Sequence, residues 1–335
     1  MFNRRKAAPG IGLAVGVTQA TIARVKHSKG KLQVAGFGSI PVPAGTADAG
    51  LISDPAKLGQ ALGELVGRMN LKGKQVVSSL GGPQVFIRNI VLPRMKINEL
   101  KEAAIFEATT FLPIPVEEAA IDVYPVRHFE DEDGKQTELF FVAVRRPQVE
   151  NLRVACEVAG LDLVAVELDP IALHRAMGGA DGDGPQAYLY MGNTRSFICV
   201  MKNGALIFQR YFSSGTSAIS QALDPEQDPH QVLFEVDMES SHQYLVRDLI
   251  TQASRSLEYF RVQFNDELQT PLVLCGTGAR IRGLDKTLSE TLDHNVVTGD
   301  VSARLLFSSK LPESERQDLN YDYLISLGLA AREVI

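Results

Sequence analysis

Residues 188–215, YLYMGNTRSFICVMKNGALIFQRYFSSG, have the pattern of three short strands joined by two turns. Gly192 and Asn193 end the first apolar strand, since both residue types tolerate a positive φ. Residues 196–201 are rich in β-forming side chains, and the pair Asn203-Gly204 that follows is typical of a hairpin turn. A third run of strand-like residues then continues as far as Phe212. The stretch therefore predicts a three-stranded meander.

The same pattern recurs near the N-terminus. Residues 12–16 form a short apolar strand that ends in glycine, residues 20–25 a second strand and residues 32–40 a third, with a turn at Lys29-Gly30. Two copies of one meander, each opening its half of the chain, indicate an internal duplication. We therefore expect an α/β protein with two related halves.

The composition is that of an ordinary globular protein. The 335 residues suffice for two domains, and 45% of them are apolar and 22% charged. The net charge of −6 argues against nucleic acid as a partner, because phosphate binding requires a basic surface. We interpret the basic cluster Arg4, Arg5 and Lys6 as a solvated tail rather than a membrane or polyanion contact.

The cysteines and the apolar runs favour the cytoplasm. Cys156, Cys199 and Cys275 are odd in number, far apart and without a CxxC motif, so we predict small core residues in a reducing compartment. No apolar run approaches the roughly 20 residues of a transmembrane helix. The start of the chain is too short in apolar residues, and too interrupted by glycine, for a signal peptide.

Hydrophobic periodicity predicts the remaining elements. We expect helices over residues 55–69, 99–111, 147–159, 170–177, 245–264, 284–292 and 320–332. We expect strands over residues 75–80, 86–93, 120–129, 138–144, 163–168 and 271–274. Asn98 is the expected cap of the second helix, and Phe264 is expected to face inward on the helix 245–264. Residues 86–168 look like a compact α+β insertion, and residues 178–185 like an interdomain linker.

Common catalytic signatures are missing from the sequence. There is no GxxxxGK, GxGxxG, GxSxG or HExxH motif and no zinc-ligand spacing. We predict that His174 is a packed or partly exposed histidine rather than a ligand. Asp181 and Asp183 are interpreted as part of the linker, because the other oxygen ligands of a calcium loop are missing. The EDEDG run at residues 130–134 is predicted to be a hairpin tip.

Three glycine turns each end a predicted strand and are candidates for anion binding. Such turns bring backbone N–H groups close to an anion, and threonine hydroxyls add donors. The third turn also precedes a predicted helix, whose N-terminus favours phosphate. A purely structural turn is the alternative at each position. The candidate cofactor-binding residues are Gly16, Val17, Thr18 and Gln19, then Gly192, Asn193 and Thr194, then Gly276, Thr277, Gly278 and Arg280.

The placement of these turns resembles the actin-like ATPase superfamily, which has two phosphate turns and a late adenosine turn. Within it, the chain is similar to the PilM family of type IV pilus assembly proteins, relatives of the cell-division protein FtsA. The resemblance covers nearly the whole chain and is most specific in residues 86–126, 188–215, 249–264 and 272–284 and in the C-terminal YLISLGLAAR. It implies a two-domain actin-like fold with duplicated ribonuclease-H-like cores and an α+β subdomain inserted in the first half.

The resemblance also implies domain boundaries. We expect a first core in residues 1–85, with residues 169–180 and 318–335 packing back onto it, and the inserted subdomain in residues 86–168. The second core is expected in residues 181–220 and 271–317, with a smaller helical and β subdomain in residues 221–270.

Two carboxylates of the family pattern are absent. Such proteins usually read close to GIDIGSSSVK at the first turn, whereas GLAVGVTQAT places Ala14 at the acidic position and Thr21 at the lysine position. At the second turn Tyr190 stands where a DIG-like sequence has its aspartate. Such carboxylates help to hold magnesium and to position the hydrolytic water. The adenosine turn is better kept, although Cys275 and Thr277 replace the usual serine and glycine. We therefore expect ATP or ADP with magnesium to bind weakly and hydrolysis to be slight or absent.

The resemblance implies a cytoplasmic scaffold beneath the inner membrane. Such a protein is implied to bind the cytoplasmic N-terminal tail of the membrane protein PilN and to connect it to the motor ATPases. The groove is implied to lie between the first core and the insert, with the strand 86–93 and the helix 99–111 as walls. The candidate partner-binding residues are Phe86, Arg88, Ile90, Leu92 and Pro93, and the alternative is that they are core of the insert.

Other functions stay open at this point. An active actin-like ATPase or sugar-kinase relative is disfavoured by the missing carboxylates. A filament-forming protein like FtsA is a further alternative, because the sequence leaves self-association open. The cytoplasmic part of the type II secretion protein GspL is another; that protein has a transmembrane helix after this domain, and we expect none here because the chain ends at Ile335.

Overall fold

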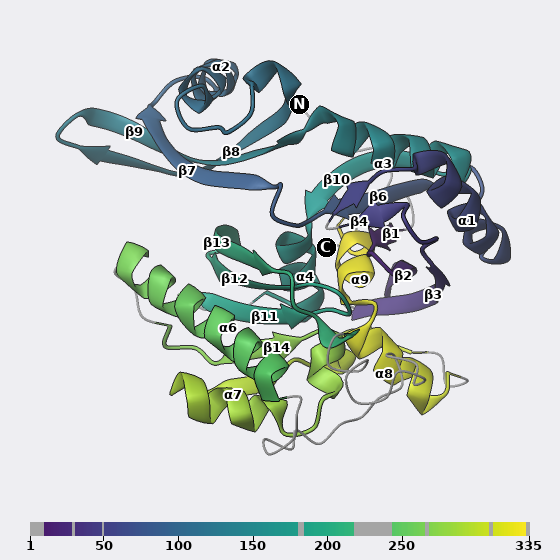
Figure 1. Cartoon of the computed structure of the whole chain (residues 1–335). Helices are drawn as coiled ribbons and strands as arrows, with labels where there is room; N and C mark the ends of the chain where they lie inside the picture. Colours follow the sequence, from purple (N-terminus) through teal and green to yellow (C-terminus); the bar gives the residue numbers. More distant parts are fainter. Residues whose placement is uncertain are drawn as a thin grey trace.

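The computed structural model describes residues 10–28, 31–48, 50–179, 184–217, 243–264, 268–307 and 311–332. It consists of two halves, each built on its own sheet, and a smaller sheet that projects from the first half (Figure 1). The basic cluster Arg4 to Lys6, Asp181 and Asp183 of the expected linker, and residues 221–242 of the expected smaller subdomain lie outside the described residues.

The first half is built on a six-stranded sheet with the order β10-β6-β1-β2-β3-β16. The N-terminal meander supplies the antiparallel strands β1 (Gly10–Val15), β2 (Gln19–Ser28) and β3 (Lys31–Pro41). The strands β6 (Gln75–Leu80) and β10 (Asp162–Leu168) extend the sheet in parallel beyond β1. The short β16 (Leu305–Leu306) pairs with β3, so part of the expected second core belongs to the first sheet.

Four helices of the first half pack on this sheet. They are α1 (Pro55–Arg68), α3 (Arg146–Val158), α4 (Asp169–Met177) and α9 (Leu324–Ala330). Helix α1 packs on α3, and α9 packs on both α4 and β1. The two-residue strands β4 (Ala47–Asp48) and β5 (Leu51–Ile52) pair with each other ahead of α1.

The second half repeats the topology of the first. Its sheet has the order β13-β12-β11-β14-β15, so in each half the meander is followed by two parallel strands beside its first strand. The strands are β11 (Gln186–Met191), β12 (Ser196–Lys202), β13 (Ala205–Phe212), β14 (Leu272–Cys275) and β15 (Val296–Thr298). This repeat confirms the predicted duplication and the two-domain α/β fold.

The turn between β12 and β13 forms as the sequence predicts. Asn203 has φ of 52° and Gly204 has φ of 73°, the left-handed values that a two-residue hairpin turn requires. The two following helices, α6 (Gln243–Phe264) and α7 (Leu284–Leu292), pack against each other, and α6 also contacts β13. Helix α6 therefore belongs to the second core rather than to a separate subdomain. Phe264, expected to face inward, is 36% exposed.

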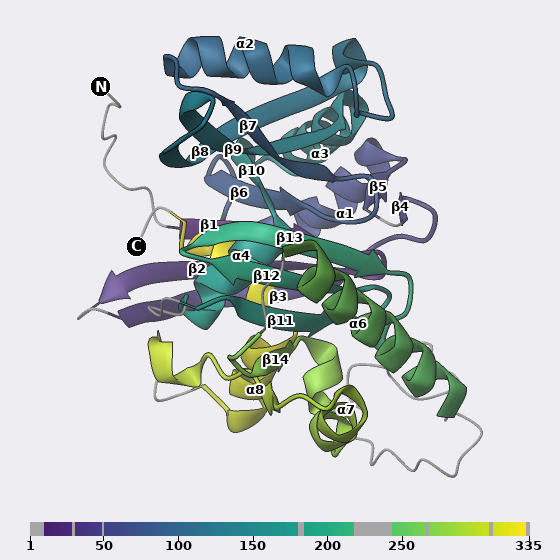
Figure 2. The ribbon, with the colours of Figure 1, turned by 90° about the vertical axis from the view of Figure 1, so that its left-hand side faces the viewer.

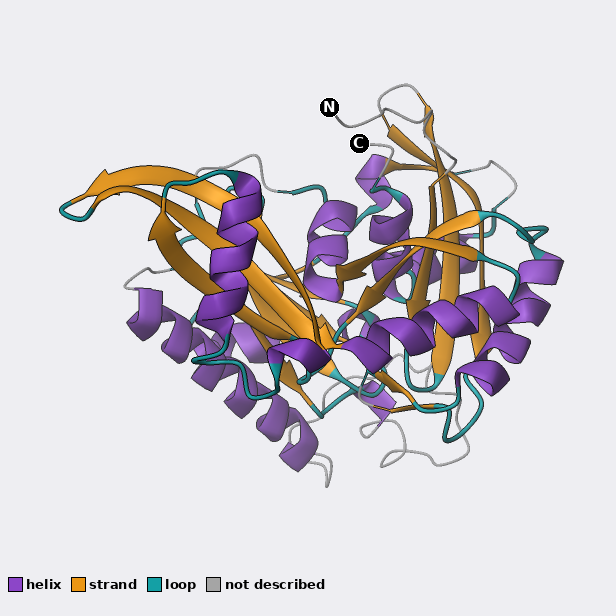
Figure 3. Ribbon diagram, turned by 90° about the horizontal axis from the view of Figure 1, so that it is seen from above, coloured by secondary structure: helices purple, strands orange, loops and turns teal. Residues whose placement is uncertain are grey.

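The inserted subdomain is smaller than predicted. It consists of β7 (Phe86–Pro93), α2 (Ile97–Ala108), β8 (Ala119–Asp131) and β9 (Gly134–Arg145), with the sheet order β7-β9-β8. Figure 3 shows this unit projecting away from the first core. The predicted boundary at residue 168 is wrong, because α3 packs on α1 and β10 pairs with β6 of the first sheet. The predicted hairpin tip between β8 and β9 is confirmed.

Two helix predictions need correction. Helix α2 begins after Lys96, whose backbone N–H donates to the Glu99 carboxylate at 3.1 Å, so Asn98 lies inside the helix and does not cap it. The same helix ends at Ala108, before Phe111. The helix expected over residues 320–332 is two helices, α8 (Glu313–Tyr321) and α9, with a break at Asp322.

The core predictions for cysteine and histidine are confirmed. Cys156, Cys199 and Cys275 are all buried and free, and burial raises the pKa of the Cys156 thiol to about 12. His174 is half-buried, with its Nδ1 2.9 Å from the Tyr188 hydroxyl. None of the described helices has both the length and the apolar character needed to cross a membrane.

Candidate functional site

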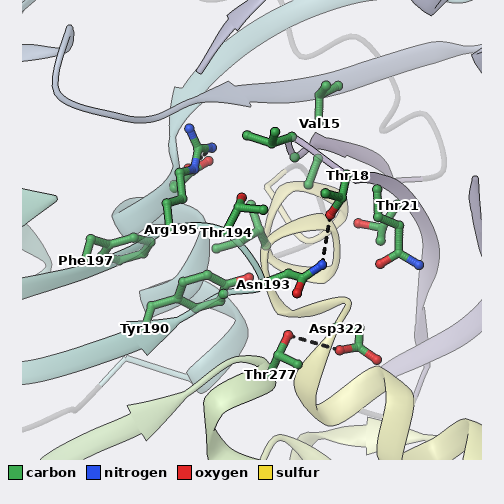
Figure 4. A pocket seen from close by; sticks show the side chains of 17 residues that line it. Val15, Thr18, Thr21, Tyr190, Asn193, Thr194, Arg195, Phe197, Thr277 and Asp322 are labelled. Atoms are coloured by element: carbon green, nitrogen blue, oxygen red, sulfur yellow. Dashed lines mark hydrogen bonds and ion pairs between the residues drawn. The ribbon is translucent and has the colours of Figure 1, made fainter. Parts of the chain in front are cut away.

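Figure 2 shows the two halves with strands β1 to β3 and β11 to β14 near one another. The three glycine turns meet at a pocket between the halves (Figure 4). A cavity of about 90 Å³ lies there. All four candidates of the first turn and all three of the second line it, whereas the third turn contributes Thr277 alone among the described lining residues. The Thr277 hydroxyl donates to the Asp322 carboxylate at 3.3 Å.

The first two turns have the same local geometry. In each, the backbone N–H of the glycine donates to a carbonyl three residues later: Gly16 to Gln19 at 2.9 Å, and Gly192 to Arg195 at 3.0 Å. A Cβ on either glycine would come within 2.8 Å of that same carbonyl oxygen. Glycine is therefore needed for the tightness of both turns, whether or not an anion binds.

The third turn is shaped by its packing on β11. Gly276 has φ of 81°, and a Cβ there would lie 2.7 Å from the Met191 carbonyl oxygen. A Cβ on Gly278 would lie 2.4 Å from the Met191 side chain. These two glycines allow the short 3-10 helix η2 (Thr277–Arg280) to lie against the end of the strand.

Arg280, the last candidate of the third turn, points toward the C-terminal helices. Its guanidinium donates to Asp318 at 2.7 Å and to Asp322 at 2.6 Å, and it lies 4.9 Å from the centroid of the Tyr321 ring. Arg280 thereby ties the third turn to α8, and its contact with a nucleotide stays a prediction.

Direct contacts cross the cleft between the halves. The Asn193 side-chain amide donates to the Thr18 hydroxyl at 2.9 Å, joining the second turn to the first (Figure 4). The Arg195 guanidinium donates to the Gly81 carbonyl at 3.0 Å and to the Asp169 carboxylate at 3.2 Å. We call these three hydrogen bonds the interdomain clasp.

The environment of Asp169 shows that the clasp is built into the fold. Asp169 is 6% exposed and also accepts a hydrogen bond from the Ser79 hydroxyl at 2.6 Å. A Cβ on Gly81 would lie 2.0 Å from the Asp169 carboxylate, so glycine makes room for it. Sequence reasoning missed Arg195 and Asp169. The available signals were a charged residue at the start of an apolar strand and an aspartate in the first turn of a helix.

The cavity in the cleft is small, and the carboxylates that line it are already paired. Small-molecule sites enclose about 300–1,000 Å³, far more than the 90 Å³ found here. Asp169 and Asp322 line the cavity, but Arg195 pairs with the first and Arg280 with the second. Among the described residues there is no group of three side chains that could hold a metal ion.

Tyr190 lies at the predicted acidic position of the second turn. Its ring stacks on Phe197 with 4.9 Å between the centroids, and burial is the main cause that raises the pKa of its hydroxyl. The group therefore stays neutral and cannot replace a carboxylate as a magnesium ligand.

A groove of about 400 Å³ lies between the insert and the first core. Five successive residues of β8, residues 120–124, form one wall, and apolar side chains of β9, α3, β10 and α4 complete it. Two charged residues at the groove are paired with each other: Glu167 accepts from Arg332 at 2.7 Å. Arg175 approaches the same carboxylate at 2.7 Å.

The predicted partner-binding residues do not line this groove. Phe86 and Arg88 line a different cavity, of about 450 Å³, on the other side of the insert. Leu92 is buried in the insert's own core, and Ile90 packs against that core. Pro93 is exposed at the end of β7. The groove between the insert and the first core has β8, rather than β7, as its wall in the insert, and its role in partner binding stays a prediction.

A family model and solved structures with similar folds match nearly the whole chain. The family model of the type IV pilus assembly protein PilM matches residues 12–334. The chain belongs to the PilM family. It is similar to a solved structure of a PilM-PilN type IV pilus biogenesis complex, with a TM-score of 0.83 and 23% identity over 98% of this chain and 99% of the other.

Two further structures show how widely this PilM-family fold is shared. The ethanolamine utilization protein EutJ from Carboxydothermus hydrogenoformans has a TM-score of 0.54 and 16% identity over 98% of this chain and 91% of its own. MreB5 of Spiroplasma citri, solved with ADP, has a TM-score of 0.52 and 11% identity over 89% and 93%. Both likenesses confirm the predicted actin-like two-domain fold.

Proposed function

We propose that the chain is a cytoplasmic scaffold of type IV pilus assembly that binds the N-terminal tail of a PilN-like membrane protein. Membership of the PilM family supports the role in pilus assembly, and the similar structure solved as a PilM-PilN complex supports the partner. The scaffold would lie at the inner membrane through this partner and would connect it to the motor ATPases.

The groove along β8 is the proposed site for the tail. Strand β8 is an edge of the insert's sheet, and an edge strand presents unpaired backbone N–H and C=O groups. An extended tail can pair with such an edge while its apolar side chains enter the groove. The side chains that would receive them include Val142 and Val144 of β9 and Val166 of β10. The alignment of an open strand edge with this apolar groove is the observation that carries the proposal.

Fluorescence polarisation with a labelled peptide of the PilN homologue's cytoplasmic tail tests this site. Tyr124 lines the groove and is 69% exposed, so Tyr124→Glu places a charge in the groove without disturbing the core. We expect the affinity to fall at least tenfold. The matched control is Phe106→Glu on α2, where the side chain is 74% exposed and does not line the groove. Absence of wild-type binding at high micromolar protein, or equal loss in both variants, would contradict the proposal.

We further propose that nucleotide binding is weak in this chain. The small cleft, the paired carboxylates and the neutral Tyr190 all support it. Titration calorimetry with ATP and magnesium provides the measurement, and we expect no heat of binding up to about millimolar ATP. Clear binding in the micromolar range would show that the clasp opens, and would favour the alternative of a nucleotide-responsive ATPase.

A further inference from the structure

A second cavity, of about 450 Å³, lies between the insert and the second core. Its wall on β9 is Phe141, whereas Phe140 and Val142 of the same strand line the β8 groove. Successive side chains of a strand point to opposite faces of the sheet. The cavity and the groove therefore lie on opposite faces of the insert, and the proposed tail would leave this cavity free.

Two sheet edges border this cavity. Strand β7 is the outer strand of the insert's sheet, and β13 is the outer strand of the second core's sheet. The first contributes Phe86, Ile87 and Arg88, and the second contributes residues 209–211. The side-chain oxygen of Gln209 is buried and has no hydrogen-bond partner among the described residues. Backbone and side-chain groups that can pair with a peptide are thus present on both sides.

The charge of the lining is positive. Of the described residues that line the cavity, Arg88 and Arg210 carry a charge and none is acidic. In the described part of the chain neither arginine has a carboxylate within ion-pair distance, although the whole protein has a net charge of −6. Arg88 lies over the Phe111 ring, 4.4 Å from its centroid, and Leu112 and Pro113 add further apolar surface.

We propose that this cavity binds an extended acidic peptide segment of a second partner protein. The peptide backbone would pair with an open strand edge, and one apolar side chain would lie beside Phe86 and Phe111. Its carboxylates would accept charge-assisted hydrogen bonds from Arg88 and Arg210. The β8 groove does not offer this chemistry, because Glu167 already pairs with the arginines near it. Two grooves of different chemistry would allow one scaffold to hold two partners at once.

A selection from a random ten-residue peptide library displayed on phage, against the immobilised full chain, tests the proposal. We expect the enriched peptides to contain at least two acidic residues and an aromatic or aliphatic residue. An enriched peptide, synthesised with a fluorescent label, should bind at least tenfold more weakly to Arg210→Glu and to Arg88→Gln. Arg94→Glu is the control: Arg94 is exposed just after β7, does not line the cavity, and its substitution changes the net charge as Arg210→Glu does.

The design separates this proposal from the proposed function. Arg210 is exposed, so its substitution tests the charge even if Arg88→Gln disturbs the stack on Phe111. Tyr124→Glu, which tests the β8 groove, should leave the acidic peptide's affinity unchanged. Enrichment of peptides without acidic residues, or equal binding to wild type and Arg210→Glu, would overturn the proposal. So would binding to phosphatidylglycerol vesicles that is lost in Arg210→Glu without any acidic peptide being enriched, since the arginines would then serve a membrane.

Discussion

Arg195 makes two of the three hydrogen bonds of the interdomain clasp. It belongs to the second glycine turn, yet its two acceptors lie in the first half, 114 and 26 residues earlier in the chain. Its side chain is 20% exposed and that of Asp169 is 9% exposed, so water solvates neither charge well. A buried carboxylate without its cation is strongly unfavourable.

Replacing Arg195 by alanine should therefore destabilise the protein. We expect the free energy of unfolding to fall by roughly 3 kcal/mol, the typical cost of removing one partner of a buried ion pair. Urea unfolding followed by circular dichroism provides the measurement. Arg153→Ala is the control, because Arg153 pairs with Glu150 on the exposed surface of α3, and it should change the stability little. Equal effects of the two substitutions would contradict a structural role for the clasp.

His174 should make the stability depend on pH. Burial, and then the charges of Arg175 and Arg304, lower the pKa of its ring below the ordinary value of 6.5. Just below pH 6.5 the unfolded chain therefore binds more protons than the folded protein, so the free energy of unfolding falls as the pH drops through that value. Between pH 7.5 and 5.5 the wild type should lose more stability than His174→Gln, measured by urea unfolding. Parallel losses in the two proteins would show that the ring does not titrate differently on folding.

At the scale of elements, α9 shows how closely two backbones approach. A Cβ on Gly328 would lie 1.8 Å from the Ala172 carbonyl oxygen. The backbones of α9 and α4 can therefore approach this closely only because Gly328 has no side chain. The same helix approaches β1 at Gly12, where a Cβ would lie 2.1 Å from the Ser326 carbonyl oxygen. Because the chain breaks at Asp322, α9 can run in a different direction from α8 and pack on both α4 and β1.

Glycine-to-alanine substitutions should have opposite effects in two helices. Gly328→Ala should lower the free energy of unfolding by about 3 kcal/mol or more, because overpacking outweighs the roughly 1 kcal/mol gain in helix propensity. Gly67→Ala in α1 has no heavy atom within 4 Å of the new Cβ, so it should raise the stability by roughly 0.5–1 kcal/mol. Thermal and urea unfolding of the two variants check the signs. A neutral Gly328→Ala would mean that α9 can move away from α4.

At the scale of the whole molecule, the clasp should keep the halves closed without a nucleotide. Small-angle X-ray scattering of the wild type should give the same radius of gyration with and without magnesium ATP. The double variant Asn193→Ala, Arg195→Ala removes the side chains that form the clasp, and we expect its radius of gyration to increase. A wild type that contracts when ATP is added would show instead that nucleotide closes the cleft.

The sequence predicted the elements well where the signal is local. The hairpin turn at Asn203 and Gly204 requires left-handed φ values, which these residue types adopt readily. The strands β6 and β7 and the helix α7 have the predicted bounds, because glycine, proline or a clear apolar period marks their ends. The predicted cap at Asn98 was wrong because the carboxylate of Glu99 satisfies the N–H of Lys96 instead.

By itself, the sequence determined the duplication, the placement of the three cysteines in the core and the three glycine turns, since each depends on neighbours within a few residues. Only the tertiary structure decided that α3 and β10 join the first core, that β8 forms the groove, and that Arg195 and Asn193 bridge the cleft. Asn193 and Thr18 are 175 residues apart. Such contacts arise from how whole sheets pack, and neither periodicity nor turn chemistry records which distant side chains will meet.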